Sequence, residues 1–226
     1  MDKDAEKRSM CGVGRTEGND DDACELGHLP TEGLALHAQT GSGLWPFNIH
    51  EVSRMAVPTS PFLHFKTFSY RFAEQVLNSR LAIKEEILSV ITDPSIEVAT
   101  LSRPYFNKVL RESFTKKGWQ DQPSVFDEEG DPAAKMDFLK ERVGIEVGFG
   151  HASFLGIDLL KFQVASYSGL DKIDVGVYIS TTKKFQGIML SRQNWEGSLT
   201  FEKIQRYLPH FKSAIQIPIY VIGIDL

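Results

Sequence analysis

The stretch that decides the fold runs from residue 136 to residue 151 and reads MDFLKERVGIEVGFGH. Between residues 143 and 149 every second residue is apolar, which is the period-2 pattern of a β-strand. The other face of this strand carries Glu146 between two glycines, Gly144 and Gly148. Because strand glycines mark places where a bulky group comes close, we expect a ligand to approach the sheet at Glu146.

A second acid, Asp137, precedes Glu146 on what we predict to be the neighbouring strand. Two carboxylates on adjacent strands can share a divalent cation, and the hard oxygens of Asp and Glu suit Mg²⁺. Such a cation polarises a phosphoryl oxygen and helps to ionise an attacking water, as phosphodiester hydrolysis requires. The spacing alone is equally compatible with two solvent-facing acids on a half-exposed sheet.

The acidic charge of the chain is concentrated at its beginning. Residues 1–60 contain ten acidic and five basic residues, so they carry the whole formal net charge of −5. This segment is rich in polar residues and glycine and lacks periodicity, which predicts a disordered extension before a single domain over residues 61–226. If translation starts at Met55, the extension is not part of the natural protein. The neutral remainder neither favours nor excludes a nucleic-acid partner.

Cysteine usage and hydropathy bear on the compartment. Both cysteines, Cys11 and Cys24, lie in the acidic extension, so we expect no disulfide in the domain and a reducing, cytoplasmic setting. The longest apolar run, Ile217–Ile224, is too short to span a bilayer, and the N-terminus has no apolar signal region. We therefore expect neither secretion nor membrane association.

Hydrophobic periodicity predicts further elements around the acidic strand pair. Residues 121–135 are polar and are predicted to form a loop. The predicted helices cover residues 71–91, 104–117, 154–167 and 200–208, and the predicted strands cover residues 63–70, 173–179 and 217–224. Strands interleaved with helices predict an α/β fold in which helices cover both faces of a mixed β-sheet.

Several segments resemble one known family. The run DFLKERVGIEVGFG, the segment IDLLKFQ and the segment DKIDVGVYI are similar to type II restriction endonucleases of the BglII/BstYI family. RPYFNKVLRESFTKKGW before them and PIYVIGI after them also match, in the same order, from about Phe68 to Leu226. The resemblance implies the PD-(D/E)xK nuclease core, which is a restriction-endonuclease-like α/β fold, with Mg²⁺ as cofactor and double-stranded DNA as partner.

The resemblance also implies roles for individual residues. Asp137 and Glu146 fall on the family's metal-binding acids, and the backbone carbonyl of Val147 would complete the ligand set. Gln122 falls where the family places a further polar residue of the catalytic site. The departure is Gly148, which stands where relatives carry the glutamine that positions the attacking water.

Gly148 leaves three alternatives open. Water could occupy the space of the missing side chain. His151 or Gln122 could reach the same space, since histidine has suitable proton chemistry. Alternatively, the chain is a weakened or inactive relative that still binds DNA. If the site is only weakened, we expect Gly148→Gln to raise the cleavage rate.

The loops after the strands are the expected DNA contacts. Arg192, Gln193 and Asn194 are residue types that make bidentate contacts to guanine or adenine, although a polar surface turn explains them equally well. Basic side chains near the acid pair could bind phosphates or simply pair with neighbouring acids. The predicted DNA-binding residues are His151, Ser153, Ser191, Arg192, Gln193, Asn194 and Lys135, with Lys140 and Arg142 as further basic neighbours.

The resemblance finally implies partners. Relatives cut unmethylated palindromic duplex DNA as homodimers, because two-fold symmetry in the protein matches that of the site. A GATC-centred target and a companion DNA methyltransferase are therefore expected. The predicted helix over residues 71–91 is our candidate for the dimer interface, although it could equally cover the core.

Overall fold

The computed structural model describes residues 62–125, 135–167, 169, 171–190, 195 and 197–226. The disordered extension predicted over residues 1–60 lies outside this part of the chain.

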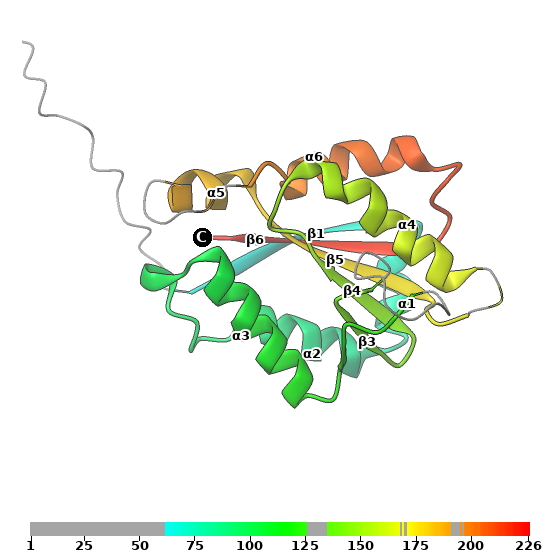
Figure 1. The fold of residues 1–226 in the computed structure, drawn as a ribbon, viewed down its shortest axis with the longest axis horizontal. Coiled ribbons are helices and arrows are strands. Elements are labelled where there is room, and N and C mark those ends of the chain that lie inside the picture. The colour runs from blue at the N-terminus through cyan, green and yellow to red at the C-terminus, as the bar shows by residue number, and fades with distance from the viewer. Residues whose placement is uncertain (1–61, 126–134, 168, 170, 191–194, 196) are drawn as a thin grey trace, which may run out of the picture. The chain divides into compact units, whose positions relative to one another are not determined.

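A mixed sheet forms the centre of the described residues, with strands in the order β1-β6-β5-β4-β3-β2 (Figure 1). β4, β5 and β6 run parallel to one another. β1 pairs antiparallel with β6, and β3 pairs antiparallel with both β4 and β2. The strands are β1 (His64–Tyr70), β2 (Gln120–Asp121), β3 (Phe138–Lys140), β4 (Val143–Val147), β5 (Val175–Thr181) and β6 (Ile219–Asp225).

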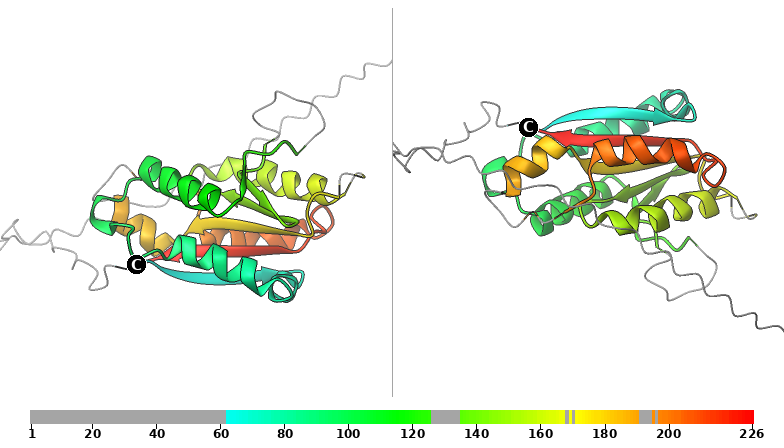
Figure 2. Two further views of the ribbon diagram at one scale, coloured as in Figure 1. Left: turned by 90° about the horizontal axis from the view of Figure 1, so that it is seen from below. Right: turned by 90° about the horizontal axis from the view of Figure 1, so that it is seen from above.

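Helices cover both faces of this sheet. α2 and α3 lie against one face, whereas α4 and α6 lie against the other (Figures 1 and 2). The helices are α1 (Ala73–Asn78), α2 (Leu81–Ile91), α3 (Arg103–Lys116), α4 (Leu155–Ser166), α5 (Lys183–Leu190) and α6 (Phe201–Tyr207). The predicted mixed sheet between two helical layers is therefore confirmed. No helix among the described residues is long and apolar enough to cross a membrane.

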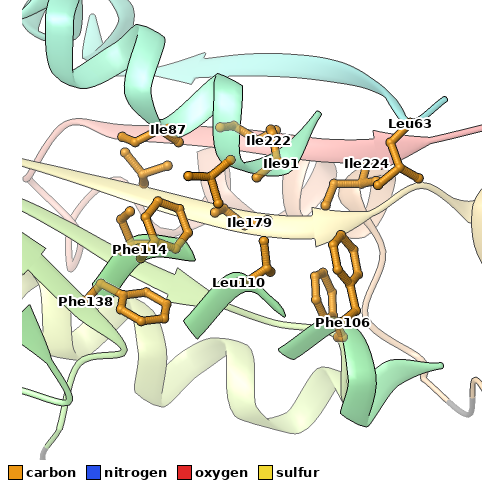
Figure 3. Packing of buried hydrophobic residues seen from close by; sticks show 14 of the residues in the cluster. Leu63, Ile87, Ile91, Phe106, Leu110, Phe114, Phe138, Ile179, Ile222 and Ile224 are labelled. Carbon is orange, nitrogen blue, oxygen red and sulfur yellow. The ribbon is translucent and has the colours of Figure 1, made fainter. Parts of the chain in front are cut away.

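The strand periodicity is explained by the core beneath α2 and α3. Val143 and Ile145 of β4 are completely buried in this core, as their alternation predicts. Side chains of α2 and α3 meet those of β5 and β6 in the same cluster (Figure 3). Figure 3 shows Ile87 and Ile91 of α2, Leu110 and Phe114 of α3, Ile179 of β5 and Ile222 of β6.

The opposite face of the sheet uses glycines to admit large side chains. A Cβ atom on Gly144 would lie 2.3 Å from the Met136 sulfur, and one on Gly176 would lie 2.8 Å from the Phe162 ring. Only glycine leaves room for such close approach. The bulky group that approaches Gly144 is therefore the protein's own Met136 side chain.

Two elements differ from the sequence predictions. The helix predicted over residues 71–91 is divided into α1 and α2, because the backbone of Arg80 is not helical, with φ −127° and ψ 54°. The Arg80 guanidinium instead bonds the Asp174 carboxylate and the Glu141 carbonyl. α5, a helix of 8 residues, was not predicted.

Candidate active site

The two predicted acids are brought together by the β3–β4 hairpin. Its turn residues, Glu141 and Arg142, both have positive φ, of 45° and 65°, as a tight two-residue hairpin turn requires. The resulting register pairs Phe138 with Ile145. Asp137, which directly precedes β3, therefore lies beside the end of β4 that carries Glu146.

Asp137 is fixed by the backbone of β4. Its Oδ2 atom accepts a hydrogen bond of 2.7 Å from the Val147 amide. Burial raises the pKa of Asp137, while the Val147 hydrogen bond and the Lys161 ammonium oppose this change. One carboxylate oxygen is thus held by the strand, in the orientation that brings Asp137 to Glu146.

Glu146 is almost fully buried, with 3% of its surface exposed. Its Oε1 atom lies 2.7 Å from the Nζ atom of Lys161, which belongs to α4. Burial and the nearby Asp137 carboxylate raise the pKa of Glu146 to about 9, against the lowering effect of Lys161. The sequence pattern placed Glu146 on an open face, and this was wrong because α4 covers that face.

Helix α4 contributes a second acid to the same site. Asp158 lies one helical turn before Lys161, and its Oδ1 atom is 3.0 Å from Lys161 Nζ. The other oxygen, Oδ2, accepts a 2.8 Å hydrogen bond from the hydroxyl of Tyr178 on β5. The backbone carbonyl of Lys135 accepts a further bond of 3.1 Å from Lys161 Nζ. Lys161 therefore connects α4, β4 and the chain that leads into β3.

Tyr178 fills the space beside Gly148. It is the register partner of Glu146 on the neighbouring parallel strand, so both side chains point to the α4 face. A Cβ atom on Gly148 would lie 2.3 Å from the Tyr178 hydroxyl oxygen and 2.6 Å from its Cε1 atom. Tyr178 therefore occupies the space where a side chain at position 148 would begin, and the three alternatives for Gly148 stay predictions.

These residues line a pocket of about 310 Å³. A second pocket, of about 400 Å³, lies on the α3 side of Asp137 and Val147 and includes Asn107, Lys108 and Arg111. The first pocket is lined by Asp137, Glu146, Val147, Gly148, Gly150, His151, Phe154, Asp158, Lys161, Tyr178 and Leu199. Asp137 and Val147 thus border both hollows, where a ligand could reach them.

The charge of the pocket fits a divalent cation. Asp137, Glu146 and Asp158 supply three carboxylates, and Lys161 supplies one ammonium, so the ionised set has an excess of two negative charges. Hard carboxylate and carbonyl oxygens are the ligands that Mg²⁺ prefers. Within the described ranges, no group of three or more His, Cys, Asp or Glu side chains is arranged to hold a metal ion. A cation here would therefore depend on Asp137, Glu146 and non-side-chain oxygens such as the Val147 carbonyl.

The other predicted site residues have different positions. Gln122 is exposed, with φ 50°, and its amide donates a 2.9 Å bond to the Asp137 carbonyl. It supports the Asp137 backbone but is not among the residues that line the pocket. His151 lies at the pocket, and its Nδ1 atom is 2.9 Å from the hydroxyl of the exposed Ser153. Ser191, Arg192, Gln193 and Asn194 lie outside the described residues.

The basic residues near the acid pair have acidic neighbours. Lys140 Nζ lies 2.8 Å from Glu86, and Arg142 bonds both Asp171 and Asp174. Lys135 uses its backbone carbonyl to accept the bond from Lys161. The geometry of Lys140 and Arg142 thus favours the interpretation that these two pair with neighbouring acids.

Sequence reasoning missed Lys161, Asp158 and Tyr178. A signal was present, because Asp158 and Lys161 form an i, i+3 pair of opposite charge on a helix whose other residues are mostly apolar. Lys161 has only 8% of its surface exposed, and lysine is rarely buried to this extent unless it is paired. Tyr178 gave no such signal, because an aromatic residue in a buried strand is ordinary.

The mixed sheet, its two helical layers and the paired acids on one hairpin define an α/β restriction-endonuclease-like fold. Residues 65–224 match the family model described as restriction endonuclease BglII/BglIII. The chain belongs to the BglII/BglIII restriction endonuclease family, and this membership supports a site-specific DNA nuclease.

Comparison of structures agrees with this assignment of the fold. The crystal structure of restriction endonuclease BglII complexed with a DNA 16-mer is similar, with a TM-score of 0.52 and 20% sequence identity, over 72% of this chain and 78% of that chain. The crystal structure of free BglII gives a TM-score of 0.46 and 19% identity, over 71% and 78% of the two chains. No curated protein matches the chain significantly.

Proposed function

We propose that the chain is a Mg²⁺-dependent type II restriction endonuclease, which hydrolyses phosphodiester bonds at a specific site in duplex DNA. The observation that carries the proposal is that strand pairing and the Val147 hydrogen bond bring Asp137 and Glu146 to one pocket. Family membership supports DNA as the substrate. The relative BglII, whose fold is similar, forms a crystalline complex with a DNA 16-mer.

Asp137 and Glu146 would hold the cation, together with the backbone carbonyl of Val147. Bound Mg²⁺ would polarise the scissile phosphate and favour ionisation of water. The chain itself keeps Asp137 oriented through the Val147 amide and keeps Glu146 in a buried, weakly screened environment. Water would attack the phosphorus in line and lose a proton to solvent as the new P–O bond forms. The bond to the 3′ oxygen would break, and that oxygen would take up a proton to leave as a 3′ hydroxyl.

Recognition would come from the loops beside the pocket. His151 and Ser153 are exposed directly after the strand that carries Glu146, which supports a role for both in contacting DNA. The predicted contacts at Ser191, Arg192, Gln193 and Asn194 remain proposals. We further propose a homodimer that cuts an unmethylated, palindromic, GATC-centred sequence beside a companion methyltransferase in the cytoplasm.

Digestion of unmethylated phage DNA, with Mg²⁺ against EDTA, tests this function. Discrete fragments that require Mg²⁺ are expected, and sequencing of their ends would give the recognition site and the cut position. Sedimentation of the protein with a duplex that contains this site would test for two copies per DNA. Absence of cleavage, combined with salt-sensitive binding to duplex DNA, would instead support a DNA-binding relative that has lost its activity.

A further inference from the structure

A chain of polar contacts leads from Gly148 to Glu146. The Tyr178 hydroxyl lies where a side chain at position 148 would begin, and it donates a 2.8 Å bond to Asp158. Asp158 lies 3.0 Å from Lys161 Nζ, which in turn lies 2.7 Å from the Glu146 carboxylate. Every link is within direct contact distance, so the four side chains form one network.

Lys161 is fixed within this network independently of Glu146. Its ammonium donates a hydrogen bond to the Lys135 carbonyl and lies at ion-pair distance from Asp158 and from Glu146. The first two belong to the chain that leads into β3 and to α4. They hold the ammonium in place, 2.7 Å from Glu146 Oε1, which is an ion-pair distance.

We propose that Lys161 is a positioning residue that fixes the Glu146 carboxylate from helix α4. The inference rests on the proposed function, in which Glu146 is a metal ligand. An ammonium that engages Oε1 leaves Oε2 as the oxygen for a divalent cation. Partners that orient metal ligands typically change metal affinity or activity about 10–100-fold when they are removed.

The same network explains why residue 148 is a glycine. Tyr178 is completely buried, and its ring also packs edge-on against Phe162, with centroids 6.5 Å apart. The ring therefore has little freedom to move away from a side chain at position 148. Gly148 admits Tyr178, Tyr178 holds Asp158, and Asp158 holds Lys161. The glycine is then a requirement of this arrangement.

The test is Mn²⁺ affinity without DNA, measured by electron paramagnetic resonance of the free ion, together with cleavage in Mg²⁺. We expect Lys161→Met to raise the dissociation constant for Mn²⁺ about tenfold or more and to lower the cleavage rate by a similar factor. Tyr178→Phe keeps the ring but removes the bond to Asp158, and we expect it to weaken Mn²⁺ binding about threefold.

Lys140→Met is the matched control. Lys140 makes an ion pair with Glu86 at 2.8 Å, close to the 2.7 Å of Lys161 with Glu146, but it does not line the pocket of Glu146. The Mn²⁺ affinity of the Lys140→Met variant should stay within about twofold of that of the parent. In a Glu146→Gln background, Lys161→Met should change the residual affinity by less than about twofold, because the positioned ligand is gone.

Parent-like Mn²⁺ affinity in Lys161→Met would overturn the proposal, and so would an undiminished effect in the Glu146→Gln background. If Lys161→Met does not fold, the Tyr178→Phe variant provides the test. An unchanged Mn²⁺ affinity in that variant would overturn the inference. Failure of the proposed function is distinguishable, because the parent itself would then cleave no DNA. A parent that cleaves, with a fully active Lys161→Met, would refute only the role of Lys161.

Discussion

The hydroxyl of Tyr178 occupies the position that a side chain on residue 148 would need, 2.3 Å from a Cβ atom built on Gly148. Tyr178 stands in register with Glu146 on the adjacent strand, so its ring also lines the pocket that contains Glu146. The glycine beside Glu146 therefore reflects internal packing. This relationship changes what substitutions at position 148 are expected to do.

Gly148→Ala should destabilise the protein by about 1–3 kcal/mol, because the added methyl group overpacks the buried Tyr178 ring. The measurement is urea unfolding. Gly156→Ala is the control, since a Cβ at this exposed position in α4 meets nothing within 4 Å. Alanine there should be neutral or stabilise by up to about 1 kcal/mol. Equal effects of the two substitutions would contradict the packing argument.

Gly148→Gln should lower the cleavage rate, which reverses the expectation from the sequence. A glutamine can be accommodated only if Tyr178 moves, and this would release Asp158 from its 2.8 Å hydrogen bond. We expect a loss of about tenfold or more in single-turnover cleavage. Faster cleavage than the parent would show that the missing side chain, rather than the Tyr178 network, limits the activity.

Asp174→Asn should weaken the ion pair that links Asp174 to Arg142 in the turn of the β3–β4 hairpin. Hydrogen bonds from Arg142 and Arg80 lower the pKa of Asp174 to about 2, despite opposing desolvation. A lowered pKa stabilises the folded state above the ordinary value, and this contribution is lost as the pH falls from about 4 towards 2. The side chain is 33% exposed, so we expect a cost near neutral pH of only about 1 kcal/mol.

Urea unfolding at neutral and acidic pH measures this effect. The difference between Asp174→Asn and the parent should shrink as the pH falls below about 4. Asp171→Asn is the control, because Asp171 also binds Arg142 but is 74% exposed. It should change the free energy of unfolding by less than about 0.5 kcal/mol. A pH-independent difference for Asp174→Asn would contradict the prediction.

Metal binding should strengthen as the pH rises. Burial and Asp137 raise the pKa of Glu146 to about 9, so the metal-free carboxyl retains a proton at neutral pH that a cation must displace. Between about pH 6 and pH 8, the dissociation constant for Mn²⁺ should fall about fivefold or more per pH unit. Glu146→Gln should flatten this dependence. A flat profile in the parent would indicate an ordinary carboxylate that is already ionised.

Much of the fold could be predicted from local patterns. The alternation around Ile145 correctly identifies a strand, although both of its faces are buried, and the apolar spacing of residues 104–117 correctly identifies α3. The break at Arg80 could not be predicted, because it depends on a bond to Asp174, which is distant in the sequence. Local periodicity carries no information on such tertiary contacts.

The site was only partly predictable for the same reason. Asp137 and Glu146 lie on one hairpin, so their proximity follows from strand pairing. Lys161 and Tyr178 reach Glu146 from another helix and another strand, and only the folded arrangement brings them together. The spacing around Gly148 indicates close approach, but it does not distinguish an external ligand from the protein's own side chain.

The most direct test of the central claim is single-turnover cleavage of one DNA substrate in Mg²⁺ by the parent, Asp137→Asn, Glu146→Gln and Glu141→Gln. Glu141 is the control, because this acid lies on the same hairpin but is exposed at its turn. The parent and Glu141→Gln should cleave at rates within about twofold of each other, while the other two lose about a hundredfold or more. Equal activity in all four proteins would contradict the assignment of the site to Asp137 and Glu146.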